Sequence, residues 1–200
     1  LNNDFELICD ARDVAMINDD FNFVKGSITT SDGQAIQDDE FQDHLHRVVL
    51  PYSQATGFEF QGEEYKVGAL SRINLNKKSL HKDTRTDAAK QLKRFPSKNI
   101  YHNNLAQAIE MLHCIDNSIG LLESSDFKKE ESAKPNGSSG EGVGVIEAPR
   151  GTLYYELIVK DNKIHDGTLV IPTAQNQVNM ERDIRKLVEE NLASGIDRHT

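Results

Sequence analysis

Cysteine is scarce in this 200-residue sequence, which contains only Cys9 and Cys114. The two residues lie far apart in the chain, and no Cys-x-x-Cys pair occurs anywhere in it. Two isolated cysteines indicate neither a disulfide framework nor a metal site by their spacing. Cys114 lies within an apolar helical pattern, so we expect a buried, structural thiol there.

Long hydrophobic runs and an excess of basic residues are also missing. No apolar run approaches transmembrane length and no signal-peptide pattern opens the chain, so we expect a soluble, cytoplasmic protein without membrane insertion. Acidic residues outnumber basic ones by 32 to 23, which gives a formal net charge of −9. An acidic surface gains no counterion-release energy from nucleic acid, so we expect no nucleic-acid partner.

The patterns that are present predict an α+β fold, with early strands, central helices, and a late antiparallel hairpin followed by a helix. Helical spacing covers residues 38–54, a segment capped by Thr84 and stopped by Pro96, a long segment from Asn103 to Leu122, and 184–192. Short apolar runs around a turn at Ser31-Asp32-Gly33 predict the early strands: Phe5–Cys9, Phe21–Val24, Ser27–Thr30, 58–60 and 65–70.

Three regions follow from these patterns. Residues 1–123 form an α+β region, and residues 143–200 carry a β-hairpin and a helix. Residues 124–142 are rich in Ser, Lys, Glu and Gly, and they cannot bury enough apolar area to offset their ordering entropy, so we expect an exposed linker. We expect the three regions to form one structural unit.

A β-hairpin is predicted in the last region. The runs 153–159 and 164–171 are rich in β-formers and flank Asp161-Asn162. If these two residues form the loop, Lys160 pairs with Lys163. The same register, continued to the open end, sets Arg150 opposite Thr173 at roughly 5 Å. A bulge at Asp166-Gly167 would shift the register by one residue and turn Thr173 to the other face.

The segment Ala148-Pro149-Arg150-Gly151 holds the candidate site. An arginine between a proline and a glycine is suited to present a fixed cation. Arg150 offers five donors in a planar fork, Thr173 offers a hydroxyl, and Pro149 offers an apolar wall without a backbone donor. These residues predict binding of a small, electron-rich ligand. The simpler interpretation is an exposed arginine at a hairpin end, with Thr173 beginning a turn.

The stretch from Glu147 to Leu153 resembles the Ala-Pro-Arg-Gly region of nickel-iron hydrogenase large subunits. Further stretches match that family in order, from about Gly57 onward. Tyr65–Asn74 is similar to the Val-Gly-Pro-Leu-Ala-Arg stretch, and residues 104–111 are similar to an Asn-x-Ala-Arg-x-x-Glu helix. Residues 171–183 resemble the soluble, multi-subunit cytoplasmic hydrogenases that pass electrons to NAD(P), sulfur or similar carriers.

This resemblance implies a nickel-iron centre with cyanide and carbon monoxide on the iron, held by thiolates of two Cys-x-x-Cys motifs. It places Arg150 over the metals as a catalytic residue, Thr173 as a donor to a cyanide, and Pro149 in the wall around the diatomic ligands. It also implies an iron-sulfur small subunit and electron-transfer subunits as partners.

The sequence departs from that family in its metal ligands. Because neither Cys-x-x-Cys motif is present, we expect no metal ligand and no bound cofactor in this chain. Tyr155 stands where the family usually has a histidine, and a phenol does not titrate near neutrality. An independent histidine site is not expected either, because His44 and His46 diverge on a helix and share a face only in a strand, and we interpret His113 as a satisfied core or boundary residue.

Three functions are therefore compared. The first is a fragment of a hydrogenase large subunit, whose parent interconverts hydrogen with protons and electrons while the isolated chain is inactive. The chain begins without methionine and stops just after a helical segment, so we expect the central part of a longer protein. The second is a metal-free, hydrogenase-like scaffold, as in respiratory quinone reductases. The third is an interaction module built on the acidic helices, which predicts no special exposure for Arg150. Cys-x-x-Cys motifs in the flanking coding sequence would separate the first from the second.

Overall fold

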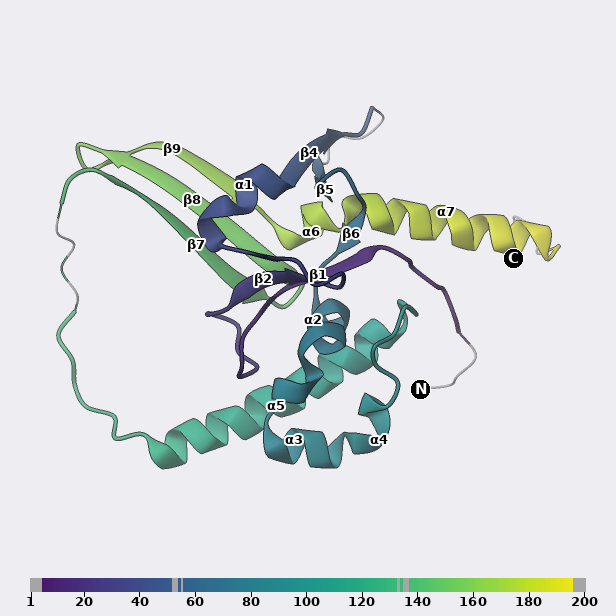
Figure 1. Cartoon of the computed structure of the whole chain (residues 1–200), viewed down its shortest axis with the longest axis horizontal. Coiled ribbons are helices and arrows are strands. Elements are labelled where there is room, and N and C mark those ends of the chain that lie inside the picture. The colour runs from purple at the N-terminus through teal and green to yellow at the C-terminus, as the bar shows by residue number, and fades with distance from the viewer. Residues whose placement is uncertain (1–4, 52–53, 55, 133, 135–136, 196–200) are drawn as a thin grey trace.

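The computed structural model describes residues 5–51, 54, 56–132, 134 and 137–195, and its fold is α+β (Figure 1). The strands are β1 (Arg12–Ile17), β2 (Ser27–Thr30), β3 (Ala35–Ile36), β4 (Leu45–Val49), β5 (Thr56–Phe60), β6 (Tyr65–Lys66), β7 (Gly140–Ala148), β8 (Gly151–Lys160) and β9 (Lys163–Val170). The helices are α1 (Phe41–His44), α2 (Ala69–Asn76), α3 (Lys82–Asp87), α4 (Ala89–Leu92), α5 (His102–Ser124), α6 (Pro172–Gln175) and α7 (Gln177–Ala193), with 3-10 turns η1 (Asp38–Glu40) and η2 (Lys77–Ser79).

The strands form three groups. A four-stranded sheet has the order β3-β2-β1-β6, in which β1 is antiparallel to β2 and parallel to β6. Strands β4 and β5 form an antiparallel ribbon, and β7, β8 and β9 form an antiparallel sheet. The β7–β9 sheet reaches away from the centre of the molecule, while its other end meets β1 (Figure 1).

One hydrophobic core lies where these strands meet. Val14 of β1 and Ile28 of β2 are fully buried, as are Phe60 of β5 and Tyr154 of β8. The ring of Phe41 from α1 stacks on Tyr154 with centroids 5.0 Å apart. Aromatic stacking adds to the hydrophobic gain of burial, so this core joins the β7–β9 sheet to the amino-terminal strands.

A second core lies among the helices below β1 in Figure 1. Leu70 and Ile73 of α2 pack with Ile109 of α5 and with Phe95, which follows α4. Phe21 joins them from the loop after β1. Helix α2 belongs to this core and also contacts β1, so it connects the helical part to the strands.

Helix α5 confirms the predicted helix from Asn103 to Leu122, but only its first half is buried. Ile109 is 3% exposed, whereas Ile115, Ile119 and Leu122 of the same predicted stripe are 57%, 50% and 67% exposed. Helix α7 likewise leaves much of its apolar stripe exposed. Among the described residues, no helix is long and apolar enough to cross a membrane.

The prediction of a buried Cys114 is wrong. Cys114 is exposed although the preceding residue His113 is buried, because successive helical residues point about 100° apart and Cys114 faces away from the second core. Cys9, in contrast, is buried. His113 confirms its prediction: it is buried, its Nδ1 accepts the His81 N–H at 3.0 Å, and its Nε2 lies 2.7 Å from the Phe21 carbonyl oxygen.

Several predicted elements differ from the structure. Residues 45–49, predicted as part of a helix, form strand β4 because they pair with β5. The spacing of apolar residues does not reveal such a pairing with another segment. The predicted strand at 65–70 ends at Lys66, because Gly68 has φ 120° and begins the turn into α2. Thr84 lies inside α3, where the cap is His81.

The predicted strands near the amino terminus are also partly wrong. Residues 5–9 contribute only an isolated bridge from Ile8, and residues 21–24 form no strand, since the Asn22 side chain accepts the N–H groups of Val24 and Lys25 in a turn. Strand β1 was not predicted, because it is buried on both faces and therefore lacks alternation. The division into three regions stays a prediction; β7 begins at Gly140, two residues before the predicted end of the linker.

Candidate functional site

Pro149 and Arg150 form the two-residue turn that joins β7 to β8. The last paired residues before this turn are Ala148 and Gly151. Gly151 has φ 134°, and a Cβ atom at this position would lie 2.3 Å from Cγ2 of Val67. A Cβ at Gly68, which has φ 120°, would lie 3.1 Å from the carbonyl oxygen of Arg150. The two glycines therefore let the turn lie directly against the beginning of α2.

The predicted register between Arg150 and Thr173 is wrong. The loop is as expected: Asp161 and Asn162 have φ 49° and 59°, and Lys160 pairs with Lys163. A bulge at His165 of β9, one residue before the Asp166-Gly167 position considered above, shifts the register by one residue, so that Tyr154 pairs with Val170. Strand β9 ends there, and Thr173 belongs to α6. The Arg150 turn joins β8 to β7, so the strand next to it is β7 and not β9, on which the prediction relied.

The structure nevertheless brings the three predicted site residues to one place. Pro149, Arg150 and Thr173 line a single cleft of about 480 Å³. The start of α2, one face of α5 and the first turns of α7 complete its walls, with Asn103, Gln107, Asn176 and Asp183 among the polar groups. Pro149 and Arg150 are exposed, and so is Thr173. Within the described part of the chain, the Arg150 guanidinium makes no hydrogen bond or ion pair, so it is available to a ligand in the cleft.

A buried charge cluster lies directly behind the turn. The Arg72 side chain is 2% exposed and makes a two-point contact with Glu110, with Nε–Oε1 and Nη2–Oε2 distances of 2.6 and 2.8 Å. Its Nη1 donates to Oε2 of Glu147 at 2.7 Å. The Glu147 Oε1 accepts the Met16 N–H and the Thr152 hydroxyl, each at 2.7 Å.

The charges of this cluster support one another. Burial alone lowers the pKa of Arg72, but the hydrogen bonds and charges of Glu110 and Glu147 outweigh it, so the pKa lies above its ordinary value. Burial raises the pKa of Glu147, and Arg72, Met16 N–H and Thr152 oppose this rise. A carboxylate that accepts three short hydrogen bonds, one from a cation, is anionic at neutral pH, so we describe the cluster as ionised.

Polar side chains near the start of α7 hold the opposite wall of the cleft. Asn176 accepts the Val67 N–H at 3.0 Å and donates to the Val67 carbonyl at 3.1 Å. Asn179 donates to the Tyr65 carbonyl at 2.6 Å, and the buried Gln175 donates to the Thr152 carbonyl at 2.6 Å. These amides fix α6 and α7 to the chain that approaches Arg150.

Sequence reasoning missed Arg72, Glu110 and Glu147 as members of one cluster. All three lie within the stretches that carry the family resemblance, which was the available signal. The distances between them in sequence, 38 residues from Arg72 to Glu110 and 75 from Arg72 to Glu147, hid their contact.

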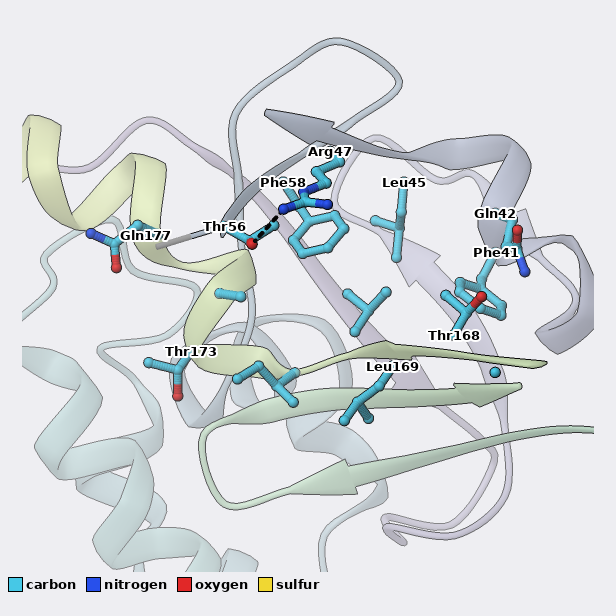
Figure 2. A pocket seen from close by; sticks show the side chains of 14 residues that line it. Phe41, Gln42, Leu45, Arg47, Thr56, Phe58, Thr168, Leu169, Thr173 and Gln177 are labelled. Atoms are coloured by element: carbon cyan, nitrogen blue, oxygen red, sulfur yellow. Dashed lines mark hydrogen bonds between the residues drawn. The ribbon is translucent and has the colours of Figure 1, made fainter. Parts of the chain in front are cut away.

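A second and larger cleft, of about 700 Å³, lies between the β4–β5 ribbon and β9 (Figure 2). Its walls are mainly apolar, with Leu45, Phe58 and Leu169 among them, and its cation Arg47 contacts the Thr56 hydroxyl at 3.4 Å. Thr173 borders both clefts, and in Figure 2 its hydroxyl points away from Phe58. Because Arg47 already has a partner and few polar groups converge here, we place the candidate site in the cleft of Arg150.

The donors in that cleft are suited to a small, electron-rich ligand rather than to a bare metal ion. Its guanidinium, hydroxyl and amides can donate hydrogen bonds, and none of the described residues that line it carries a thiol. Among the described residues, no group of three or more His, Cys, Asp or Glu side chains could hold a metal ion. Cys9 is buried and hydrogen-bonds the cleft residue Asp183 without lining the cleft itself, and His44 Nδ1 lies 2.8 Å from Gln61.

Comparison with known proteins identifies relatives along most of the chain. Residues 29–194 match the sequence profile of the nickel-dependent hydrogenase family. Sulfhydrogenase 1 subunit alpha of Pyrococcus furiosus is 31% identical over 177 residues, which are 86% of this chain and 40% of that protein. NAD-reducing hydrogenase HoxS subunit beta of Cupriavidus necator is 33% identical over 168 residues, which are 76% of this chain and 34% of that protein.

Solved structures show the same fold. An NAD+-reducing NiFe-hydrogenase in its H2-reduced state aligns with a TM-score of 0.66 and 22% identity, over 88% of this chain and 43% of that one. The Ni-Fe-Se hydrogenase of D. vulgaris Hildenborough aligns with a TM-score of 0.55 and 19% identity, over 76% and 38% of the two chains. The chain thus spans less than half the length of the proteins that it resembles.

Proposed function

This chain belongs to the nickel-dependent hydrogenase family, and we propose that it is the part of a large, catalytic subunit that presents Arg150 to a nickel-iron centre. The family match covers the Pro149-Arg150 turn, the Arg72 cluster and Thr173. The observation that carries the proposal is the cleft in which three groups converge: a guanidinium without a partner among the described residues, an exposed hydroxyl and a proline wall. The parent protein interconverts hydrogen with protons and electrons.

The residues of this chain act around the centre rather than as its ligands. The centre, when bound, supplies the splitting of hydrogen, and its cyanide and carbon monoxide ligands come with it. Arg150 directs hydrogen bonds and positive charge toward the ligands in the cleft, where charge changes during bond cleavage are stabilised most. Thr173 donates one further hydrogen bond, and Pro149 excludes water from its side of the cleft.

The isolated chain is inactive in this proposal, because it holds no pair of Cys-x-x-Cys thiolates. Soft thiolates select and hold such metals. We expect the purified 200-residue chain to contain no stoichiometric nickel and to show no hydrogen uptake. Elemental analysis after dialysis against a chelator tests this, and retention of one nickel per chain would overturn it.

The exposed apolar faces of α5 and α7 support a larger subunit around this chain. Ile119 and Leu122 of α5 and Ile184 of α7 are each at least half exposed. Isolated soluble proteins rarely expose large contiguous apolar surfaces. We propose that the remainder of the large subunit covers these faces. An iron-sulfur small subunit and electron-transfer subunits are the further partners, in the cytoplasm and without nucleic acid.

A metal-free scaffold, similar to the subunit of respiratory quinone reductases, is the second candidate. The absence of Cys-x-x-Cys pairs from these 200 residues is the observation that favours it. Both candidates use the same fold, but only the first needs thiolate pairs in the flanking sequence. Reading the coding sequence on both sides separates them.

A further inference from the structure

Every N–H group of the Arg72 guanidinium has a partner in the structure. Nε donates to Glu110 at 2.6 Å, Nη1 donates to Glu147 at 2.7 Å and to the Ala148 carbonyl at 3.0 Å, and Nη2 donates to Glu110 at 2.8 Å and to the Pro149 carbonyl at 3.2 Å. An arginine has five N–H donors, so the set is complete. The ring of Phe23 lies 5.6 Å from the guanidinium carbon and covers one face of it.

Three of these five bonds end on consecutive residues of the turn segment. Arg72 holds the side chain of Glu147 and the carbonyl oxygens of Ala148 and Pro149, and the next residue is Arg150. The N–H of Glu147 is held as well, by the Phe23 carbonyl at 2.8 Å. The backbone is therefore fixed up to the residue that carries the free guanidinium.

We propose that Arg72 is a positioning residue for Arg150. Its buried guanidinium locks the Ala148 and Pro149 carbonyls and thereby directs the Arg150 side chain into the cleft. Apart from its packing against Val67 and Gly68, the turn has no equivalent polar restraint from its own side chains, because proline has no side-chain donor and the Arg150 side chain makes no hydrogen bond within the described residues. The rigidity of the turn thus comes from behind it.

A purely structural role explains the cluster less well. Buried ion pairs contribute little to stability compared with apolar residues of the same volume, because both charges lose their hydration. What a guanidinium adds is geometry: a planar fork can contact two carboxylates and two carbonyls in one plane, which neither a lysine nor an apolar side chain can do. The restraint on the turn is the feature that requires arginine. Only its consequence for hydrogen turnover rests on the function proposed above.

The test uses backbone 15N relaxation of the 200-residue chain, with Arg72→Lys as the variant. In the wild-type chain we expect the order parameters of Arg150 and Gly151 to be about 0.85, as in the adjoining strands. In Arg72→Lys they fall below about 0.6 at these two residues, while those of β7 and of the rest of β8 stay unchanged. Unchanged order parameters in the turn of a folded Arg72→Lys chain would overturn the proposal.

Two matched variants separate positioning from stability. Arg182→Lys changes an arginine that pairs with Glu64 at the surface, and Thr84→Val removes a buried hydroxyl that donates to Asp116, far from the turn. Both should leave the order parameters of Arg150 and Gly151 at the wild-type value. A loss of order there in Thr84→Val would show that general destabilisation loosens the turn, and would also overturn the proposal.

A measurement on the wild-type chain keeps the proposal testable if Arg72→Lys does not fold. Scalar couplings across the hydrogen bonds from the Arg72 guanidinium to the Ala148 and Pro149 carbonyl carbons are expected, and the Arg72 N–H protons should exchange slowly with solvent. Exchange at the rate of an exposed arginine would refute the clamp. Hydrogen turnover of Arg72→Lys in the whole hydrogenase tests the function proposed for Arg150. A loosened turn with normal turnover would support the proposal that Arg72 positions Arg150, but it would contradict the function assigned to Arg150.

Discussion

Replacement of Glu147 by glutamine tests whether the buried charge cluster holds the β7–β8 hairpin in place. The side chain of Glu147 is fully buried, and its two oxygens accept hydrogen bonds from Arg72, Met16 and Thr152, each at 2.7 Å. In Glu147→Gln the amide oxygen can keep Met16 and Thr152 as donors. Its NH2 group then faces the Nη1 donors of Arg72.

The expected loss follows from this geometry. A hydrogen bond to a charged group contributes roughly 1.5–3 kcal/mol, and a buried donor left without an acceptor costs about 1–3 kcal/mol. Removing a buried charge relieves part of its desolvation penalty, which offsets some of this loss. We therefore expect Glu147→Gln to lower the free energy of unfolding by about 2–4 kcal/mol, a large share of the roughly 5–15 kcal/mol typical of a domain.

Urea unfolding at neutral pH, followed by circular dichroism, measures this difference. Glu63→Gln is the control, because Glu63 pairs with Arg12 while 64% of its side chain remains exposed. Surface pairs of this kind contribute about 0–1 kcal/mol. If Glu147→Gln cost no more than Glu63→Gln, Glu147 would be protonated in the folded chain, and the ionised cluster described here would be wrong.

Two further predictions concern the turn and the helical core. Gly151→Ala should lower the free energy of unfolding by about 2–4 kcal/mol, because the added Cβ meets Val67 at 2.3 Å and a positive φ strains alanine. Its control is Gly120→Ala, which has open space on α5 and should be neutral or stabilising by up to about 1 kcal/mol. Equal effects of the two substitutions would contradict the close approach of Gly151 to Val67. Burial lowers the pKa of His113, so the unfolded chain binds a proton more readily than the folded one. The contribution of this residue to stability should therefore be complete above about pH 6.5 and be lost as the pH falls through the lower folded pKa. Urea unfolding from pH 7.5 to 5 should show a weaker pH dependence of the free energy of unfolding for His113→Gln than for the wild type. An unchanged pH dependence in the variant would exclude His113 as the source of this effect.

Local chemistry in the sequence was enough to predict the β8–β9 hairpin. Asp161 and Asn162 tolerate positive φ, which a two-residue hairpin loop needs at both positions, and the flanking runs are strong β-formers. The same is true of α5, because its apolar residues recur at helical spacing and predict a helix without knowledge of where it packs in the fold. The family resemblance favoured Arg150, Pro149 and Thr173 as site residues. Without it, the simpler interpretation was an exposed arginine at a hairpin end, with Thr173 beginning a turn.

What could not be predicted depends on contacts between distant residues. The bulge at His165 and the pairing of β7 with β8 changed the neighbour of Arg150, although Thr173 reaches the same cleft from α6. The exposure of Cys114 follows from which face of α5 the second core covers, and apolar spacing alone did not fix that face. Arg72 was visible as part of a family stretch, but its role emerges only when Glu110, Glu147 and the turn carbonyls meet around it.

The most direct test of the central claim is hydrogen turnover by Arg150→Lys in the whole hydrogenase proposed here. Lysine keeps the charge but replaces a planar fork with a mobile point charge, so the variant should assemble its full complement of nickel and iron and lose about a hundredfold in kcat, equivalent to about 2.7 kcal/mol. Thr173→Val, which removes one neutral hydrogen bond of roughly 1 kcal/mol, should cost less. An Arg150→Lys enzyme with full metal content and near-normal turnover would show that Arg150 is structural and that the site is assigned wrongly.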